Sequence, residues 1–316
     1  YVLTLDVGDK PGEGNGVEVY WNGELVKVIS AADVPDGEFT KVSLVLDGDS
    51  GDGSGRLGFG GTGPVDNYGA SIDSVELYEV DPSQGEGDDD LIGGKGDEIM
   101  NGFNGNDELR GGAGNDELNG GGGADFLLGG NGNDILRGST GNDELRGAGG
   151  NDDLFGGNGD DLVTGAGGSD ELYGGANDDT LKGGGNGDMI EGGSGNDKLL
   201  GQGGADDMDG GSGNDVLIGG TGGDRITGGT GNDRLKGRGG IDIFEYAVGG
   251  DADKIKDYDD GTDLIDLSDF GFANAAAALA FASQVGSDTV FVFGSGDKLT
   301  VEDTQIGVLG SGDLIL

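Results

Sequence analysis

The sequence predicts an all-β protein: a long parallel β-solenoid, preceded by a partial antiparallel β-sandwich and followed by a β-rich cap with one short helix. Three observations predict this class. A nine-residue pattern repeats over residues 84–245, residues 1–82 contain alternating apolar and polar side chains, and residues 246–316 contain further short apolar runs. The predicted domains are therefore 1–82, 83–245 and 246–316, with Pro82 near the first boundary.

The central pattern keeps its register through eighteen consecutive units, from Gln84 to Glu245. Position six is Asp in every unit except one, which has Glu98, and position eight is apolar in all of them. Position one is Gly in every unit but the first, and position four is Gly except at Asn177 and Asn186. Glycine-rich disorder has no reason to hold such a register, so the pattern indicates a folded repeat.

The repeat follows the motif G-G-x-G-x-D-x-U-x, in which U is a large apolar residue. We expect the glycines at positions one, two and four to adopt positive φ in a tight turn whose carbonyl oxygens face inward. Position six adds a carboxylate, and a flexible set of oxygen ligands selects Ca²⁺ over Mg²⁺ and the transition metals. The x-U-x triplet is expected to form a short strand whose central side chain points into the core.

These repeats resemble the nonapeptide repeats of the RTX family, which are found in bacterial proteins exported by type I secretion. The resemblance implies a right-handed parallel β-roll with two nonapeptides per turn and Ca²⁺ between units i and i+2. Ions would lie between Asp107 and Asp125, between Asp116 and Asp134, and so on, with at most sixteen such pairs. Glu98 departs from the pattern, because its extra methylene shifts the carboxylate. The implied ligands are Asp89, Asp107, Asp116, Asp125, Asp134, Asp143, Asp152, Asp161, Asp170, Asp179, Asp188, Asp197, Asp206, Asp215, Asp224, Asp233 and Asp242.

The same repeats predict that folding depends on the metal. Each unit buries about one apolar side chain. The free energy gained from this burial is smaller than the entropic cost of ordering nine residues. Stacked carboxylates add repulsion, so cation coordination must supply the folding free energy. The family resemblance implies that such a chain stays unfolded in the calcium-poor cytosol and folds outside the cell. The expected location is therefore extracellular or on the bacterial surface.

Composition excludes several classes of function. The 316 residues include 78 glycines, carry a net charge of −45, and contain neither cysteine nor histidine. Disulfides, thiolate metal sites, HExxH zinc sites and Ser–His–Asp triads are therefore impossible within this sequence. Only 17 Lys and Arg residues are present, which argues against nucleic acid as a partner. No apolar run is long enough to span a bilayer.

Residues 246–316 resemble the carboxyl-terminal segment of serralysin-type RTX proteins, in "IFEYAVGGDADKIKDYDDGTDLIDLSDFGF", "DTVFVFGSGDKLTVED" and "GSGDLIL". The resemblance implies a cap that also carries an uncleaved secretion signal at Asp313, Leu314, Ile315 and Leu316, with the type I machinery as partner. Simple closure of the last sheet is the alternative role. Residues 272–285 are interpreted as a helix packed on the domain. Two interpretations are open for four aspartates of this segment: they bind a further ion, or they are solvated. These are Asp251, Asp253, Asp257 and Asp263.

The first 82 residues alternate as strands in "YVLTLDV", "GVEVYWNGELVKVI", "TKVSLVL", "GRLGFGG" and "ASIDSVELYEV", with a hairpin turn at Asn22-Gly23. The opening is strand-like rather than an export signal, and we expect the domain to begin before this sequence does. "NGVEVYWNGELV" and "GTGPVDNYGASIDSVEL" resemble jelly-roll, lectin-like modules. That resemblance implies a glycan site formed by Trp21, Asp66, Asn67 and Tyr68. The alternative is that these side chains pack in the core.

Three classes of function are consistent with these features. The first, which we favour, is a non-enzymatic calcium-folded module for export and extracellular display. The second is a calcium-dependent adhesin or lectin in which the roll is a spacer. The third is the tail of a secreted enzyme acting on polysaccharide or protein, although no pair of carboxylates stands out as catalytic.

Overall fold

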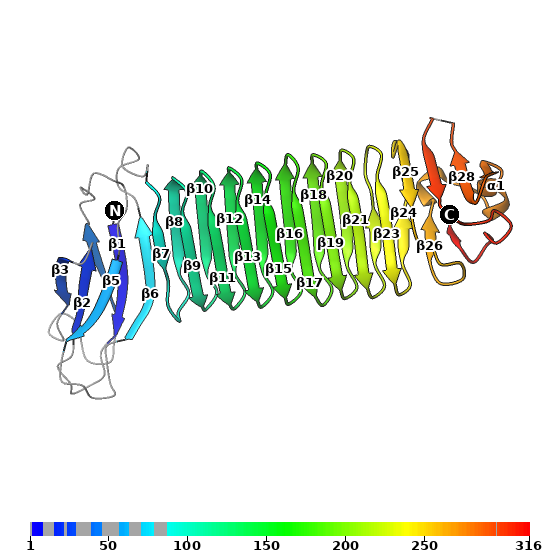
Figure 1. The fold of residues 1–316 in the computed structure, drawn as a ribbon. Helices are drawn as coiled ribbons and strands as arrows, with labels where there is room; N and C mark the ends of the chain where they lie inside the picture. Colours follow the sequence, from blue (N-terminus) through cyan, green and yellow to red (C-terminus); the bar gives the residue numbers. More distant parts are fainter. Residues whose placement is uncertain are drawn as a thin grey trace. The chain divides into compact units, whose positions relative to one another are not determined.

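The computed structural model describes residues 87–294 and 296–316 with their side chains, and the backbone of six earlier strands. The chain folds as two compact units, Tyr1–Ala148 and Gly149–Leu316. Both units are built of β-strands, and the one α-helix among the described residues is α1 (Ala275–Leu279) (Figure 1). The predicted all-β class is confirmed. The domain boundaries at 82 and 245 remain a prediction.

The first unit opens with six antiparallel strands whose positions match the alternating stretches of the sequence. Strand β1 pairs with β4 and β6, and β2 pairs with β3 and β5. The hairpin between β2 and β3 is confirmed, whereas its predicted turn at Asn22-Gly23 lies outside the described residues. The strands are β1 (Val2–Gly8), β2 (Gly16–Trp21), β3 (Glu24–Ile29), β4 (Phe39–Val45), β5 (Leu57–Thr62) and β6 (Ser71–Tyr78).

The rest of the first unit is repeat structure. Even-numbered strands follow one another in the order β6-β8-β10-β12, and odd-numbered strands follow in the order β7-β9-β11-β13. The parallel pairing of β6 with β8, at Glu76 and Ile99, joins the antiparallel strands to the repeats. The repeat strands are β7 (Asp90–Ile92), β8 (Ile99–Asn104), β9 (Glu108–Ala113), β10 (Glu117–Gly122), β11 (Phe126–Asn131), β12 (Ile135–Thr140) and β13 (Glu144–Gly149).

The second unit continues the same alternation in two parallel sheets. One sheet has the order β14-β16-β18-β20-β22-β24 and the other β15-β17-β19-β21-β23. These strands are β14 (Asp153–Asn158), β15 (Leu162–Gly167), β16 (Glu171–Ala176), β17 (Thr180–Gly185), β18 (Met189–Ser194), β19 (Lys198–Gly203), β20 (Asp207–Ser212), β21 (Val216–Thr221), β22 (Arg225–Thr227), β23 (Arg234–Gly239) and β24 (Ile243–Glu245).

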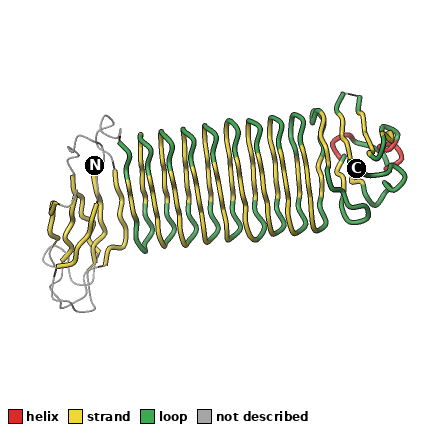
Figure 2. Tube along the Cα trace, viewed as in Figure 1, coloured by secondary structure: helices red, strands yellow, loops and turns green. Residues whose placement is uncertain are grey.

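The pairing register confirms two nonapeptides per turn. Leu172 pairs with Ile190, which in turn pairs with Met208, so hydrogen-bonded neighbours are 18 residues apart. Most repeat strands are six residues long, from position seven of one repeat to position three of the next. They are therefore longer than the predicted x-U-x triplet, because the parallel ladder also pairs positions two and three. Strands and short turns alternate regularly along each unit (Figure 2).

A single column of apolar side chains fills each roll. Every position-eight residue from Leu91 to Phe244 is buried, and most are fully inaccessible to solvent. The neighbouring residues at positions seven and nine face outward, so that strand burial alternates as in β16 and β17. One buried apolar side chain per repeat was predicted from the sequence, and the structure confirms it.

Residues 246–316 close the second unit by adding strands to both of its sheets. Strand β29 extends the odd-numbered sheet beside β25, and β30 extends the even-numbered sheet beside β26. Helix α1 is much shorter than the predicted 272–285, and the last four residues of that segment form β27. The elements are β25 (Ala252–Ile255), β26 (Leu264–Asp266), the 3-10 turn η2 (Ser268–Phe270), α1, β27 (Ala282–Val285), β28 (Asp288–Val292), β29 (Lys298–Val301) and β30 (Leu314–Ile315).

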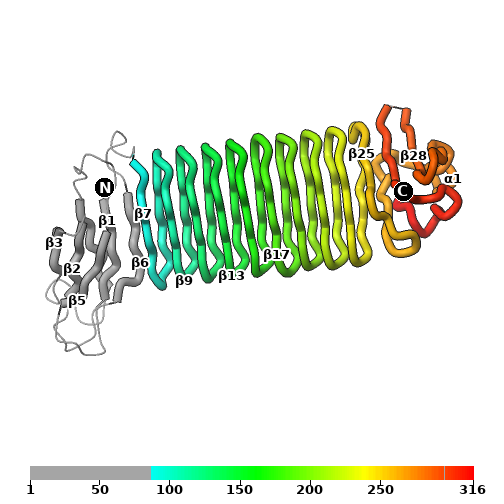
Figure 3. Tube along the Cα trace, viewed as in Figure 1, coloured from blue at the N-terminus to red at the C-terminus, as the bar shows by residue number. Residues whose placement is uncertain are grey.

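The cap contains an aromatic cluster of its own. The Phe270 and Phe293 rings stack with centroids 4.2 Å apart, and Tyr246 and Phe291 lie about Phe293 at 5.7 and 6.0 Å. The predicted β-rich cap with one short helix is thus confirmed, and it follows the last repeats directly in the sequence (Figure 3).

Candidate metal site

The turns between strands are set by left-handed residues at positions two and four of each repeat from Gly102 onward. Asn177 and Asn186, which replace the position-four glycine, have φ of 82° and 76°, as expected for the residue that best tolerates this region after glycine. Position two is left-handed even where it holds Phe103 or Arg238, at 74° and 71°. Position one does not have positive φ, so the prediction for that glycine was wrong.

Space, rather than a dihedral angle, requires glycine at position one. A methyl group on Gly201 would lie 2.2 Å from Asp206 Oδ2 and 2.7 Å from the carbonyl oxygen of Gly219. At Gly183 the distance to Asp188 Oδ2 would be 2.3 Å. The missing side chain therefore leaves room where a carboxylate oxygen meets a main-chain oxygen of the next turn.

Main-chain oxygens of positions two and four face the adjacent turn as well. A methyl group on Gly175 would lie 2.2 Å from the Gly157 oxygen, and one on Gly195 would lie 2.0 Å from the Asn177 oxygen. Main-chain oxygens of one turn thus lie against the backbone of the next turn along the edges of the roll.

The position-six carboxylates form a ladder along the stack. The backbone N–H of Asp170 donates to Asp188 Oδ1 at 2.9 Å, and the N–H of Asp188 donates to Asp206 Oδ1 at 2.9 Å. The same bond links Asp107 to Asp125 at 2.8 Å in the first unit. Each aspartate therefore lies against the one 18 residues away, which is the pairing that the sequence predicted within each unit.

The second oxygen of these carboxylates is buried without a hydrogen bond. This holds for the nine aspartates named at the end of this paragraph: each residue is at least 97% inaccessible, and its Oδ2 has no donor among the described residues. A buried anionic oxygen without a donor is costly, and a cation removes that cost. The residues with such an Oδ2 include Asp107, Asp125, Asp170, Asp179, Asp188, Asp197, Asp206, Asp215 and Asp224.

Burial and mutual repulsion weaken the acidity of this ladder. Burial, followed by the charges of Asp170 and Asp206, raises the pKa of Asp188 from 3.8 to about 7. The pKa values of Asp179 and Asp215 are raised to about 7 for the same reasons. A column of carboxylates in this state needs either protons or metal cations to remain folded at neutral pH.

Glu98 occupies the position-six place despite its longer side chain. It is buried, and its backbone N–H donates to Asp116 Oδ1 at 2.8 Å. Burial and the adjacent Asp116 carboxyl raise the pKa of Glu98 to about 7. The backbone of Glu98 therefore keeps the hydrogen bond of the ladder, and its longer side chain brings its carboxyl group into contact with that of Asp116.

The ladder continues beyond the nonapeptides into the cap. Asp253 Oδ1 accepts the N–H of Asp233 at 2.9 Å, and Asp263 Oδ1 accepts the N–H of Asp242 at 3.1 Å. Their spacings are 20 and 21 residues instead of 18, so the strict nonapeptide register did not place them in the ladder. Both are among the four aspartates for which a further ion site was one interpretation of the sequence, and both are buried rather than solvated. An aspartate two residues before an apolar strand residue, as in Asp253-Lys254-Ile255, was the available signal.

Comparison with known families decides the identity of the repeats. The model of the RTX calcium-binding nonapeptide repeat matches seven overlapping segments between residues 85 and 252: 85–107, 101–136, 128–163, 155–190, 182–217, 209–244 and 218–252. The chain belongs to the RTX family. No curated protein matches it. RTX repeats bind calcium as a family, which agrees with the all-oxygen character of the turns.

Two solved structures are similar to parts of this RTX chain. A subunit of the Azotobacter vinelandii mannuronan C5-epimerase is 26% identical and covers 44% of this chain and 78% of its own, with a TM-score of 0.30. The extracellular lipase LipA from Serratia marcescens is 18% identical and covers 73% of this chain and 40% of its own, with a TM-score of 0.29.

The donor set fits calcium. Within residues 87–294 and 296–316, no three acidic side chains converge on one point, so main-chain oxygens must complete any shell built on the aspartate ladder. Oxygens of both kinds meet at the edges of the roll, for example beside Gly201. No helix in the described ranges is long and apolar enough to cross a membrane.

The predicted glycan site falls outside the described side chains. Trp21 is the last residue of β2, where the structure describes the backbone alone. Asp66, Asn67 and Tyr68 lie outside the described residues. Glycan contact by these four residues remains a prediction, to be tested on a glycan array with Trp21→Ala as the comparison.

Proposed function

We propose that this chain is a calcium-folded module of a secreted bacterial protein, which serves type I export and extracellular display. The observation that carries the proposal is the ladder of buried aspartates, in which residues such as Asp170, Asp188 and Asp206 have one oxygen bonded to the neighbouring turn and the other without a donor. Such an arrangement is unfavourable in a calcium-poor compartment and becomes favourable when a divalent cation occupies the turns.

The proposed ligands of each ion are the position-six aspartate of one repeat, its counterpart 18 residues away and the carbonyl oxygens beside them. Asp170, Asp188 and Asp206 are one such series. Calcium bound there neutralises the ladder and cross-links consecutive turns. The glycine at position one keeps the space open, and the left-handed residues at positions two and four turn the carbonyls toward it.

A calcium titration of the chelator-treated chain tests this proposal. Far-UV circular dichroism and small-angle scattering should show an expanded chain in EDTA and a cooperative gain of strand at millimolar calcium. Magnesium at the same concentration is the matched control and should fold the repeats poorly, because it prefers a rigid octahedral shell with water. Equal strand content in EDTA and in calcium would refute the proposal.

Export is the second part of the proposal and depends on residues 246–316. Asp313 Oδ2 accepts the N–H of Gly310 at 2.7 Å, and Leu314 is buried in β30. The carboxyl end therefore has a structural role in the cap, which is compatible with a secretion role while the chain is unfolded. Secretion from a host with a type I transporter should fall when Asp313 and Leu314 are both changed to Ala. Undiminished secretion of this variant would contradict the assignment of the signal.

We propose no catalytic role for the repeats. Their buried carboxylates are accounted for as calcium ligands. Assays for polysaccharide hydrolysis, epimerisation and proteolysis on the calcium-loaded chain should show no turnover. Activity that survives the loss of a ladder aspartate but not the loss of another residue would overturn this view.

A further inference from the structure

The two faces of the second unit differ in charge. The strands of the odd-numbered sheet, β15, β17, β19, β21 and β23, contain no acidic residue. They carry five basic residues, namely Lys182, Lys198, Arg234, Lys236 and Arg238. The even-numbered strands β14 to β24 carry one basic residue, Arg225, and six acidic ones, Asp153, Glu171, Glu191, Asp207, Asp209 and Glu245.

This basic face stands out against the charge of the whole chain. The sequence contains only 17 Lys and Arg residues against 62 Asp and Glu. No carboxylate among the described residues lies within ion-pair distance of Lys182, Lys198 or Arg238, whereas Arg225 on the other face pairs with Glu245. The basic side chains are therefore available to an external anion rather than engaged within the roll.

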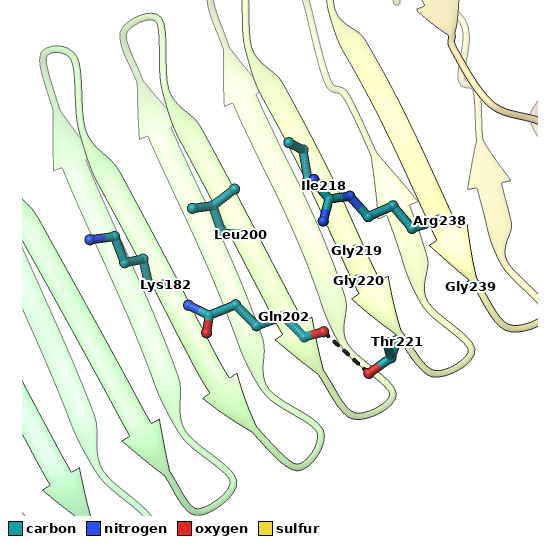
Figure 4. Close-up of a pocket in the computed structure, with 9 residues that line it drawn as sticks. All are labelled: Lys182, Leu200, Gln202, Ile218, Gly219, Gly220, Thr221, Arg238 and Gly239. Carbon is teal, nitrogen blue, oxygen red and sulfur yellow. Dashed lines mark hydrogen bonds between the residues drawn. The ribbon is translucent and has the colours of Figure 1, made fainter.

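A groove runs across the basic face. It has a volume of about 650 Å³, and its long side chains are Lys182, Leu200, Gln202, Ile218 and Arg238. Figure 4 shows these side chains on one surface of the sheet, with Lys182 and Arg238 toward the two ends and the apolar pair between them. Three strand-to-strand steps separate β17 from β23, which is roughly 14 Å at the usual spacing.

The chemistry of the groove favours a linear, carboxylated polysaccharide. Cations at both ends match acidic groups spaced along a chain, Gln202 offers an exposed amide, and Leu200 and Ile218 provide an apolar floor for the C–H faces of sugar rings. Exposed Asp160 and Asp178, in the turns before β15 and β17, would repel a broad polyanion such as duplex DNA or an anionic bilayer. A narrow single chain avoids them.

We propose that the basic face of the second unit, formed by β17, β19, β21 and β23, binds linear polyuronate chains. The proposal requires the folded roll but does not depend on type I export. A failure to fold and a failure to bind can be distinguished, because folding is followed by circular dichroism in the same samples used for binding.

Fluorescence anisotropy of a labelled short oligogalacturonate, with the full calcium-loaded chain, tests this site. The expected result is binding that weakens with added NaCl and is absent for the methyl-esterified oligomer. Lys182→Gln with Arg238→Gln should weaken affinity about fivefold to tenfold, since each exposed ionic contact contributes modestly. The matched control, Arg137→Gln with Arg225→Gln, changes the net charge equally on even-numbered strands and should leave affinity unchanged.

Several results would overturn the proposal. Binding that persists in the Lys182/Arg238 variant would indicate calcium bridging between the sugar and acidic side chains. Equal weakening in the control variant would indicate a net-charge effect. Binding of single-stranded DNA or of anionic phosphatidylglycerol vesicles through the same residues, without oligogalacturonate binding, would assign the face to another partner.

Discussion

Replacing one ladder aspartate by asparagine should have opposite effects with and without calcium. Asp188→Asn keeps the shape of the side chain and the oxygen that accepts the Asp170 N–H at 2.9 Å, but it removes the charge. In calcium, a charged ligand is lost from the sites on both sides of the turn. In chelator, a buried anion that repels Asp170 and Asp206 is lost instead.

The magnitudes follow from the structure. The pKa of Asp188 is raised from 3.8 to about 7, and each unit corresponds to about 1.4 kcal/mol, which gives an upper bound of about 4 kcal/mol for the ionised group. Solvent screening at the turn lowers this, and we expect the metal-free roll to gain about 2 kcal/mol. At a hundredfold excess over its dissociation constant, one ion contributes about 2.7 kcal/mol, so losing two sites costs about 5 kcal/mol.

Urea unfolding at pH 7.5 measures both effects, with saturating calcium in one series and EDTA plus trimethylamine oxide in the other to populate the compact state. The control is Asp207→Asn, which changes the charge equally on an exposed side chain of β20. It should have little effect in either series. If Asp188→Asn destabilises the chain in both series, or in neither, then the ladder does not balance calcium against repulsion as argued.

Three other predictions test separate parts of the roll. Because the folded pKa of Asp179 is about 7 and its unfolded value is near 3.8, the metal-free roll is favoured below about pH 4 and loses that stability as the pH rises through 7; circular dichroism in EDTA should therefore show strand gained on acidification. Gly183→Ala should raise the calcium midpoint and destabilise the fold by about 1–3 kcal/mol, whereas Gly185→Ala, with no contact nearer than 3.8 Å, should not. Leu181→Ala should cost about 2–5 kcal/mol in calcium by urea unfolding, with outward Leu200→Ala far less costly, and equal costs would contradict the single-column core.

Periodicity made most of this fold predictable. A fixed count of nine places position six of each repeat on a turn and position eight inside, which accounts for the buried column ending at Phe244. The pairing of aspartates 18 residues apart was implied by the resemblance to the RTX repeats. The left-handed Asn177 and Asn186 followed from the known tolerance of asparagine for that region. Alternation likewise located the six antiparallel strands of the first unit.

Other features depend on contacts that no local pattern encodes. The need for glycine at position one arises from Asp and carbonyl oxygens of the same and neighbouring turns, not from its own dihedral angles. Asp253 and Asp263 join the ladder across loops of irregular length, which only the three-dimensional pairing reveals. The alanine-rich segment after Asn274 suggested a long helix, but its last residues, Ala282–Val285, form β27 and pair with β28.

The aspartate ladder also gives the stack a direction. In the ladder the position-six N–H groups, such as those of Asp170 and Asp188, donate toward the following turn, so the ladder of one turn is complete only when the next turn along the chain is already in place. Asp253 and Asp263 supply that partner for the final repeats, from a segment with its own aromatic core. Ordering should therefore spread from the carboxyl-terminal end toward the amino terminus, and the cap acts as a template as well as a lid.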